Sequence, residues 1–293
     1  MEFEEIEYSV ADGIATITLD RPDQLNAFTA RMVNELLAAL DEVDRDDDVR
    51  VAILTGRGRA FSAGADMSAG AQTFDYDDDR SGEAVGAERV PRVPAPRDGC
   101  GRITLRLFDC LKPVISAVNG AAVGMGATLL LATDIRMASE QARFGFVFTR
   151  RGIAPEGAST WFLPRLVGVA QAAEWLYTGR LFGADEALAG GLVRSVHPAD
   201  ELLDAARALA GEMAETAPVS VALTRQMLWR MLGADHPMAA HRADSRAVYA
   251  TGAGPDAREG VMSFLEKRPA RFTGRPSTDL PEVFPDWVDP QYS

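Results

Sequence analysis

The fold is decided by residues 114–136, which read VISAVNGAAVGMGATLLLATDIR. The first five residues form an apolar run, too short to cross a membrane, that predicts a strand buried on both faces of an α/β or spiral sheet. Gly120, Gly124 and Gly126 then interrupt the chain before an apolar segment at 127–132 that predicts a helix. Glycines in this place let backbone N–H groups approach a ligand at the positive end of the helix. The stretch is therefore either an anion-stabilising site or a tightly packed turn.

Composition and charge narrow the classes of partner. Apolar residues make up 47% of the 293, which is typical of a globular chain with one large domain and a smaller appendage. The formal net charge of −13 disfavours nucleic acid, because phosphate-backbone binding depends on clustered Lys and Arg. The glycine stretch lacks the Lys-Ser/Thr of a phosphate loop and an ordered Gly-x-Gly-x-x-Gly, so a nucleotide is disfavoured too. A small anionic ligand is still compatible, since a few local basic residues can hold a phosphate.

The cysteines and the N-terminus indicate the compartment. Cys100 and Cys110 are too few for a disulfide scaffold and have no His partners at metal-ligand spacing, so we expect free thiols and no metal site. Residues 1–5 are acidic where a signal peptide would be basic, and no apolar run reaches the ~18 residues of a membrane span. We therefore expect a cytoplasmic protein without a membrane segment.

Two units of strands and helices precede residue 140. Residues 6–10 and 14–19 alternate around Asp12-Gly13, the strong signal of a β-hairpin. Thr29 is placed to cap a helix whose apolar face ends at Leu40, and 49–55 predicts a buried strand. A strand at 114–118, a helix at 125–131 and a strand at 135–138 repeat this order. The repeat is one of pattern and not of letters.

A second run of small residues occupies 56–67, directly after the strand at 49–55. Its place in the first unit matches that of the glycine stretch in the second. Two such loops can offer two backbone N–H donors to one oxygen, which stabilises an enolate or a tetrahedral oxyanion.

The composition changes sharply from Ser68 to Gly101, where an acidic run is followed by three prolines with little apolar periodicity. Such a segment is typical either of a mobile loop or of a lid over a neighbouring site. Its position beside the small-residue run keeps both interpretations open.

Several segments together resemble the enoyl-CoA hydratase/isomerase, or crotonase, superfamily. The resemblance covers nearly the whole chain in the right order. The segments that carry it are Arg21-Pro22 with Leu25-Asn26-Ala27, Phe61-Ser62-Ala63-Gly64-Ala65-Asp66, the run from Lys112 to Gly120, Asp134-Ile135-Arg136, Tyr177-Thr178-Gly179, Ala184-Asp185-Glu186-Ala187, Gly190-Gly191-Leu192-Val193, and Phe264-Leu265-Glu266-Lys267-Arg268-Pro269.

The resemblance implies an α/β fold, a crotonase-like spiral of ββα repeats with a C-terminal helical region. We place the spiral core with the acyl-CoA site at 1–200, and the helical region, used for trimer formation and ending in a Pro-rich tail, at 201–293. Within that region the sequence itself predicts helices at 200–215, 218–231 and 238–249. The implied substrate is an acyl-CoA thioester, with no further cofactor. The implied assembly is a homotrimer, or a hexamer built as a dimer of trimers.

The resemblance also implies a set of site residues. The thioester oxygen is held by two backbone N–H groups, which carry over to Ala65 and Met125. For Asp66, capping of a following helix is an equally good interpretation. The residues that carry over to the surroundings of the CoA are Gln24, Asn26, Ala27, Ala63, Asp66, Met67, Phe264 and Lys267.

The acids point to the reaction. Where a typical hydratase of the family carries two Glu residues, this chain has Thr128 and Phe148, so the carboxylate pair that adds water is missing. Gly152 to Ser159 instead resembles the Pro-Glu-Gly-x-Ser segment of Δ3,Δ2-enoyl-CoA isomerases, in which the Glu shuttles a proton. Glu156 is therefore the catalytic candidate. Pro155 and Ser159 predict that it lies at a helix start, where the dipole favours the ionised form, whereas aromatic neighbours would oppose ionisation by desolvation.

Three functions stay open on this basis. The first is isomerisation of an enoyl-CoA through Glu156, and the second is hydration with the same single acid and a water molecule. The third is a non-catalytic acyl-CoA-binding relative in which Glu156 serves only folding, since acids are common in first turns of helices. Asp134 fits a structural acid with buried hydrogen bonds better than a catalytic one.

Overall fold

Two β-sheets form the centre of the molecule. The computed structural model describes residues 3–77, 85–91 and 95–292. A six-stranded sheet has the order β1-β2-β3-β5-β7-β10, and a four-stranded sheet has the order β4-β6-β8-β9. The strands are β1 (Ile6–Ala11), β2 (Ile14–Leu19), β3 (Val51–Gly56), β4 (Ala60–Ser62), β5 (Val114–Val118), β6 (Ala121–Val123), β7 (Ile135–Ser139), β8 (Arg143–Gly145), β9 (Phe182–Gly183) and β10 (Ser195–His197).

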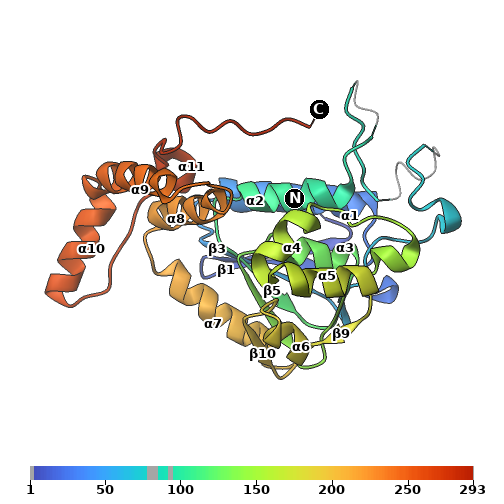
Figure 1. Cartoon of the computed structure of the whole chain (residues 1–293). Coiled ribbons are helices and arrows are strands. Elements are labelled where there is room, and N and C mark those ends of the chain that lie inside the picture. Colours follow the sequence, from blue (N-terminus) through green and yellow to red (C-terminus); the bar gives the residue numbers. More distant parts are fainter. Residues whose placement is uncertain (1–2, 78–84, 92–94, 293) are drawn as a thin grey trace.

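Three consecutive strand pairs pass from the larger sheet to the smaller one. In β3/β4, β5/β6 and β7/β8 the first strand joins the larger sheet and the second joins the smaller, with parallel neighbours in both. Helix α1 (Ala30–Arg45) precedes the first pair, α2 (Gly99–Asp109) the second, and α3 (Met125–Leu130) follows the second. The predicted spiral of ββα repeats is confirmed (Figure 1).

Local sequence signals account for several of these elements. Asp12 and Gly13 form the two-residue turn between β1 and β2, both with positive φ, as a hairpin turn of this length requires. The hydroxyl of Thr29 accepts a hydrogen bond from the Met32 N–H at 3.1 Å, which caps α1. All five residues of β5 are buried, as expected for a strand between two parallel neighbours.

Other elements differ from the prediction. The segment expected to stay irregular to Gly101 ends earlier, because α2 begins at Gly99 and Asp98 caps it. Strands β4, β6 and β8 span three residues each, too few for a periodic pattern. The lid prediction for the segment that begins at Ser68 falls partly on residues 78–84 and 92–94, outside the described residues.

The C-terminal part is helical. Its helices are α7 (Leu202–Ala214), α8 (Pro218–Met231), α9 (Pro237–Gly252), α10 (Pro255–Glu266) and α11 (Pro276–Asp279), of which α10 and α11 were not predicted. Helix α7 packs Leu202, Ala206 and Ala210 against strands of the larger sheet. Helices α9 and α10 extend to one side, away from α3 and α4 (Ser159–Val167) (Figure 1). The division at residue 200 stays a prediction.

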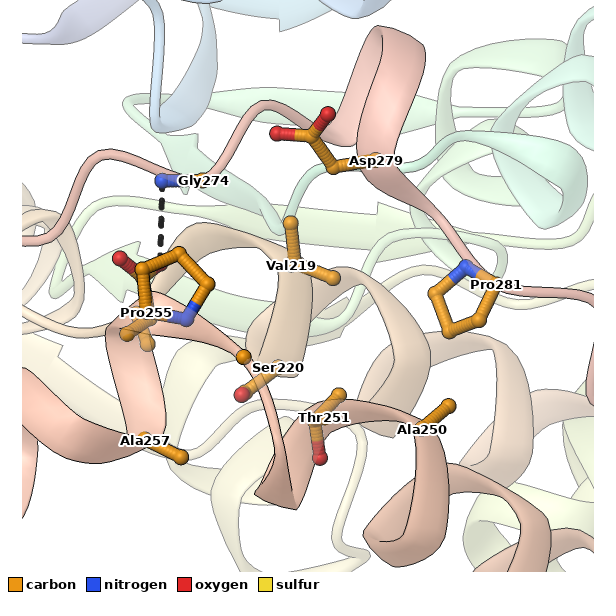
Figure 2. A pocket seen from close by; sticks show the side chains of 12 residues that line it. Val219, Ser220, Ala250, Thr251, Pro255, Ala257, Gly274, Asp279 and Pro281 are labelled. Carbon is orange, nitrogen blue, oxygen red and sulfur yellow. Dashed lines mark hydrogen bonds between the residues drawn. The ribbon is translucent and has the colours of Figure 1, made fainter.

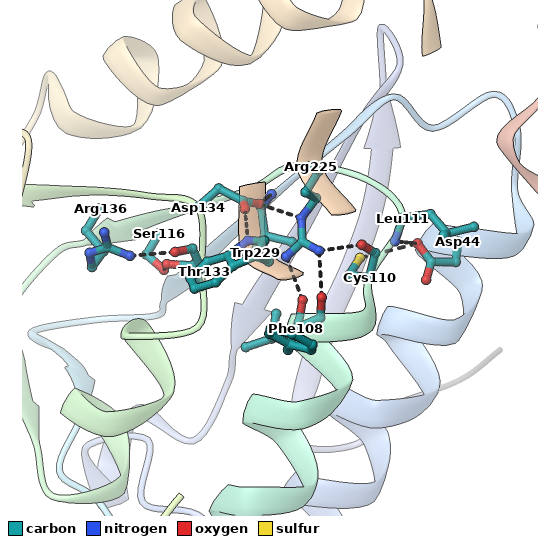
Figure 3. A network of polar contacts seen from close by, with 12 residues as sticks. Asp44, Phe108, Cys110, Leu111, Ser116, Thr133, Asp134, Arg136, Arg225 and Trp229 are labelled. Carbon is teal, nitrogen blue, oxygen red and sulfur yellow. Dashed lines mark hydrogen bonds and ion pairs between the residues drawn. The ribbon is translucent and has the colours of Figure 1, made fainter. Parts of the chain in front are cut away.

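A polar network joins the helical part to the core (Figure 3). Asp134 accepts hydrogen bonds from the Val114 N–H at 2.7 Å, the Arg225 guanidinium at 2.9 Å and the Trp229 indole at 2.6 Å. The same guanidinium donates to the backbone carbonyls of Leu107, Phe108 and Cys110 at the end of α2. Asp134 is therefore a structural acid, as predicted.

None of the helices in the described part of the chain combines the length and the apolar character that crossing a lipid bilayer requires.

Candidate active site

Two backbone N–H groups come together beside the first turn of α3. Ala65 forms an isolated parallel bridge with Phe28, in which the Phe28 N–H donates to the Gly64 carbonyl and the Asp66 N–H donates to the Phe28 carbonyl. In such a bridge the N–H of the central residue points away from the partner strand. The Ala65 N–H has no acceptor among the residues described, so it can donate to a ligand.

The second N–H belongs to Met125, the first residue of α3. The first N–H groups of a helix have no partner within it, and they form its positive end. A Cβ placed on Gly64 would lie 3.5 Å from the Met125 nitrogen, so the Ala65 loop and this helix end are neighbours. That the two amides bind one thioester oxygen stays a prediction.

Glu156 lies before α4 and not at its start, so that prediction is wrong. The helix begins at Ser159, and Gly157 and Ala158 both adopt left-handed conformations with φ of 62° and 55°. These two residues turn the chain before the helix can start. Glu156 therefore lies outside the first turn, where the helix dipole has its effect.

The segment carrying Glu156 packs on the first turn of α3. A Cβ on Gly157 would come within 2.6 Å of the Cys100 sulfur and 2.7 Å of the Thr128 methyl carbon. The Cys100 thiol in turn contacts the Met125 carbonyl at 3.8 Å. The fold thus places the segment that carries Glu156 and the loop that carries Ala65 beside α3.

Burial controls the protonation of Glu156. Although its side chain keeps partial access to solvent, the surrounding protein raises its pKa from 4.5 to about 8, and the negative charge of Asp98 adds to the effect. The sequence left open whether desolvation or the helix dipole dominates. Desolvation dominates, because Glu156 precedes the helix.

The two positions that the sequence predicts to correspond to the hydratase acids hold buried side chains without a carboxyl group. Thr128 is fully buried on α3, and its hydroxyl has no hydrogen-bond partner among the described residues. Phe148 is buried in the hydrophobic core. Neither can transfer a proton at neutral pH.

The loop predicted to lie along the CoA is held by its own polar groups. The Asn26 side chain is completely buried, accepts from the Arg21 N–H and donates to the Arg57 and Ala60 carbonyls. It therefore shapes the loop, and its amide group is not available to a ligand. Arg21 also donates to the Ala27 carbonyl, and Ala27 is buried.

Asp66 forms an ion pair with Arg21 at 2.9 Å and accepts from the Ser68 N–H. Burial opposes ionisation, but these hydrogen bonds and the charge of Arg21 outweigh it and lower the pKa of Asp66. The interpretation of Asp66 as a helix cap is wrong, because the next helical turn (Gly70–Gln72) begins after Ala69.

The remaining predicted CoA neighbours fall into two groups. Gln24, Ala63 and Met67 are exposed on the loops around Asn26 and Ala65. Phe264 and Lys267 lie at the end of α10. Within a single chain, this helix is far from α3 and α4 (Figure 1). Within one chain the structure therefore does not bring these two residues to Glu156.

Comparison with known proteins decides the family. The enoyl-CoA hydratase/isomerase family matches residues 9–275. The chain belongs to the enoyl-CoA hydratase/isomerase family. It is 39% identical over 264 residues to "Enoyl-CoA hydratase ACTT3" of Alternaria alternata, covering 89% of this chain and 83% of that protein. It is 36% identical to "1,2-epoxyphenylacetyl-CoA isomerase" of Escherichia coli K12, covering 91% and 97%.

A solved structure agrees with this assignment. The probable enoyl-CoA hydratase/isomerase from Mycobacterium abscessus superposes with a TM-score of 0.80 at 36% identity, covering 92% of this chain and 99% of that one. The fold is therefore the crotonase fold, and the chain is an enzyme of the enoyl-CoA hydratase/isomerase family.

Sequence reasoning missed two residues beside the acid of this family member. Asp98 accepts from the Gly157 N–H at 3.1 Å, and Tyr76 is partly buried within electrostatic reach of Glu156. Burial raises the pKa of Tyr76, and the charges of Glu156, Asp98 and Cys100 add to it. Both residues lie in or beside the poorly patterned segment before α2, where no periodicity or family motif marks them.

A separate cavity of about 430 Å³ lies between α8, α9 and α10 (Figure 2). Its walls are mostly small or apolar, among them Val219, Thr251 and Pro255. The carboxylate of Asp256 on its wall already accepts from the Thr273 and Gly274 N–H groups. The cavity is remote from the residues gathered at α3, and we assign no chemistry to it.

Proposed function

We propose that this enzyme moves the double bond of an enoyl-CoA, with Glu156 as the proton shuttle and the Ala65 and Met125 N–H groups as the oxyanion hole. The observation that carries the proposal is that the segment of Glu156 and Gly157 packs on Thr128 of α3, while Thr128 and Phe148 stand at the positions predicted for the hydratase acids. An isomerisation needs one group that takes and returns a proton, whereas hydration through a carboxylate pair needs two.

The expected reaction begins with a 3-enoyl-CoA whose thioester oxygen accepts from the Ala65 and Met125 N–H groups. Ionised Glu156 takes a proton from C2. The electron pair of the broken C–H bond forms a double bond between C2 and the thioester carbon, and the carbonyl pair moves onto the thioester oxygen. The two N–H dipoles stabilise this enolate, with the positive end of α3 behind one of them. Protonated Glu156 then returns the proton to C4, which leaves a 2-enoyl-CoA and the ionised acid.

The raised pKa of Glu156, about 8, suits a group that works in both directions. A proton shuttle is most effective when its pKa lies near the working pH, because both protonation states are then accessible. At pH 7 about a tenth of such a group is ionised in the free enzyme. A relative named "Trans-2-decenoyl-[acyl-carrier-protein] isomerase" in Streptococcus mutans, at 29% identity, supports double-bond isomerisation, and relatives named hydratase make hydration the competing reaction.

The substitution Glu156→Gln tests the proposal. It keeps the shape of the side chain and removes the ionisable group. We expect kcat for isomerisation of 3-enoyl-CoA to fall at least ~100-fold, because general acid–base catalysis contributes about 10²–10⁴-fold. KM should change little, since the N–H donors stay. The isomerisation rate is measured as formation of the conjugated 2-enoyl thioester. The hydration rate is measured as loss of the same thioester.

Glu201→Gln, an exposed acid immediately before α7, is the matched control and should keep the parent rate. A Glu156→Gln enzyme as active as the parent would show that the assignment of Glu156 is wrong. A parent that hydrates 2-enoyl-CoA but does not isomerise 3-enoyl-CoA would favour the hydratase. Binding of acyl-CoA without either reaction would favour the non-catalytic relative.

We also propose that the chain works as a homotrimer or a dimer of trimers. Large apolar side chains are exposed along α9 and α10, including Tyr249 at 87% and Phe264 at 81%. Residues of this kind on one protruding pair of helices favour a contact with another subunit. In such an assembly, Phe264 and Lys267 could reach the CoA of a neighbouring subunit, which agrees with their distance from Glu156 in one chain.

A further inference from the structure

Gly157, the residue after Glu156, is held on both of its backbone polar groups by α2. Its N–H donates to the Asp98 carboxylate at 3.1 Å, and its carbonyl accepts from the Thr104 hydroxyl at 3.0 Å. Asp98 caps α2 at the same time, accepting from the Gly101 N–H at 2.6 Å. A single carboxylate oxygen thus ties the start of α2 to the residue that follows the catalytic acid.

The position of Gly157 cannot easily change. Its φ of +62° favours glycine, and Cys100 and Thr128 leave no room for a Cβ. Gly157 is fixed by the hydrogen bond of its N–H, by that of its carbonyl and by the lack of space beside its Cα. It therefore determines where the preceding peptide lies. The direction in which the Glu156 side chain leaves the backbone follows from it.

We propose that Asp98 is a positioning residue for Glu156, holding the acid at the oxyanion hole through the Gly157 N–H. The inference rests on the proposed function of Glu156. Asp98 touches no reacting atom, so its effect on the reaction passes through the acid. Displacing a catalytic group by about 1 Å can cost up to ~10²-fold in rate, which makes such a clamp effective.

The charge of Asp98 gives it a second effect on the same acid. A carboxylate near Glu156 disfavours a second negative charge, and it adds to burial in raising the pKa of Glu156. Among the described residues, Cys100 and Tyr76 also lie within electrostatic reach of this pair, and burial raises the pKa of both. Burial thus favours their neutral forms, whereas the charge of Asp98 acts directly on Glu156.

Two substitutions separate position from charge. Asp98→Asn keeps an oxygen that can accept from the Gly101 and Gly157 N–H groups and removes the charge. We expect it to lower the midpoint of the kcat-against-pH profile by about one unit, with a plateau at high pH near that of the parent. Asp98→Ala removes the acceptor as well. At the high-pH plateau it should lower kcat about 10-fold, with KM for the acyl-CoA within about twofold.

Thr104→Val removes the hydroxyl that donates to the Gly157 carbonyl and that also lies 3.3 Å from the Gly101 carbonyl. It replaces Asp98→Ala as the position test if that variant does not fold. The matched control is Asp256, whose carboxylate also accepts from two backbone N–H groups of a distant segment, those of Thr273 and Gly274. Asp256→Asn and Asp256→Ala should leave both the pH midpoint and kcat unchanged.

The outcomes are distinct from those of the proposed function. If Glu156→Gln is inactive and the position variant keeps the parent kcat, Asp98 serves only as a helix cap and this inference is overturned. If Asp98→Asn keeps the pH midpoint of the parent, the proposed effect of the Asp98 charge on Glu156 is overturned. If Glu156→Gln keeps full activity, the proposed function itself fails, whatever the Asp98 variants do.

Discussion

At the residue scale, Glu156 combines a chemical use with an energetic cost. Burial of its carboxyl group disfavours the ionised form that must remove a proton from the substrate. The buried hydroxyl of Thr128, which has no partner among the described residues, lies in the same place and adds a second cost. Both costs lie at the end of α3 where the proposed chemistry occurs, which is where proteins tend to accept them.

We expect the stability of the protein to fall with pH because of Glu156. The folded-state pKa of about 8 lies above the ordinary value of 4.5, so between these values the folded protein holds a proton that the unfolded chain has released. The contribution is fully present below about pH 4.5 and is lost as the pH rises through 8, with a slope of at most ~1.4 kcal/mol per pH unit.

Thermal unfolding of the parent and of Glu156→Gln at several pH values measures this contribution. The melting temperature of the variant minus that of the parent should grow from pH 5 to pH 8 and then level off. A difference independent of pH would show that Glu156 is not strongly perturbed.

The sequence predicts Glu156 as the acid but not its surroundings. The Pro-Glu-Gly-x-Ser pattern indicates the acid, and the resemblance to the family indicates the amides of Ala65 and Met125. The contact between Asp98 and Gly157 joins residues 59 positions apart. Such a contact depends on how α2 packs on α3. The sequence around Asp98 and around Gly157 contains no local pattern that predicts it.

At the scale of elements, α8 is the link between the helical region and the core. Its bounds follow from the sequence, since Pro218 is its first residue, as is common in helices. Its role does not, because the acceptors of Arg225 lie 91 to 118 residues earlier in the chain. The sequence patterns that define a helix carry no information on distant carbonyl groups.

Arg225→Met should destabilise the protein by about 3–5 kcal/mol, because it leaves the partly buried Asp134 and three carbonyls without their donor. Urea denaturation measures the loss. Arg207→Met is the matched control, since Arg207 pairs with Asp204 on the exposed surface at 3.7 Å and should cost under about 1 kcal/mol. Equal losses in the two variants would contradict the role of Arg225.

At the scale of the whole molecule, the protruding helices α9 and α10 expose more apolar surface than a monomer needs (Figure 1). The spiral core could be predicted from the sequence because each repeat has its own strand or helix signal. Helix α10 could not be predicted, because its exposed apolar residues do not form the one-sided stripe of a helix that packs on its own core. A helix whose apolar residues have no partner in the same chain lacks the amphipathic pattern from which helices are predicted.

The parent should sediment at three or six times the chain mass of 31.5 kDa. Tyr249→Asp and Phe264→Asp should shift it toward smaller species, because each places a charge in the proposed contact. Val169→Asp, at another exposed apolar position on α5 (Val169–Thr178), should leave the assembly intact. A parent that sediments as a monomer would contradict the proposed assembly.

The hydrogen bonds from Arg225 to the end of α2 can form only late in the synthesis of the chain. The carbonyls of Leu107, Phe108 and Cys110 leave the ribosome 115 to 118 residues before the guanidinium that binds them. At about 5–20 residues per second, this interval lasts roughly 6–24 s. During it, these carbonyls lack the donor that Arg225 provides in the finished fold. The spiral therefore reaches its final stability only after α8 has been translated, although every strand of both sheets is already complete.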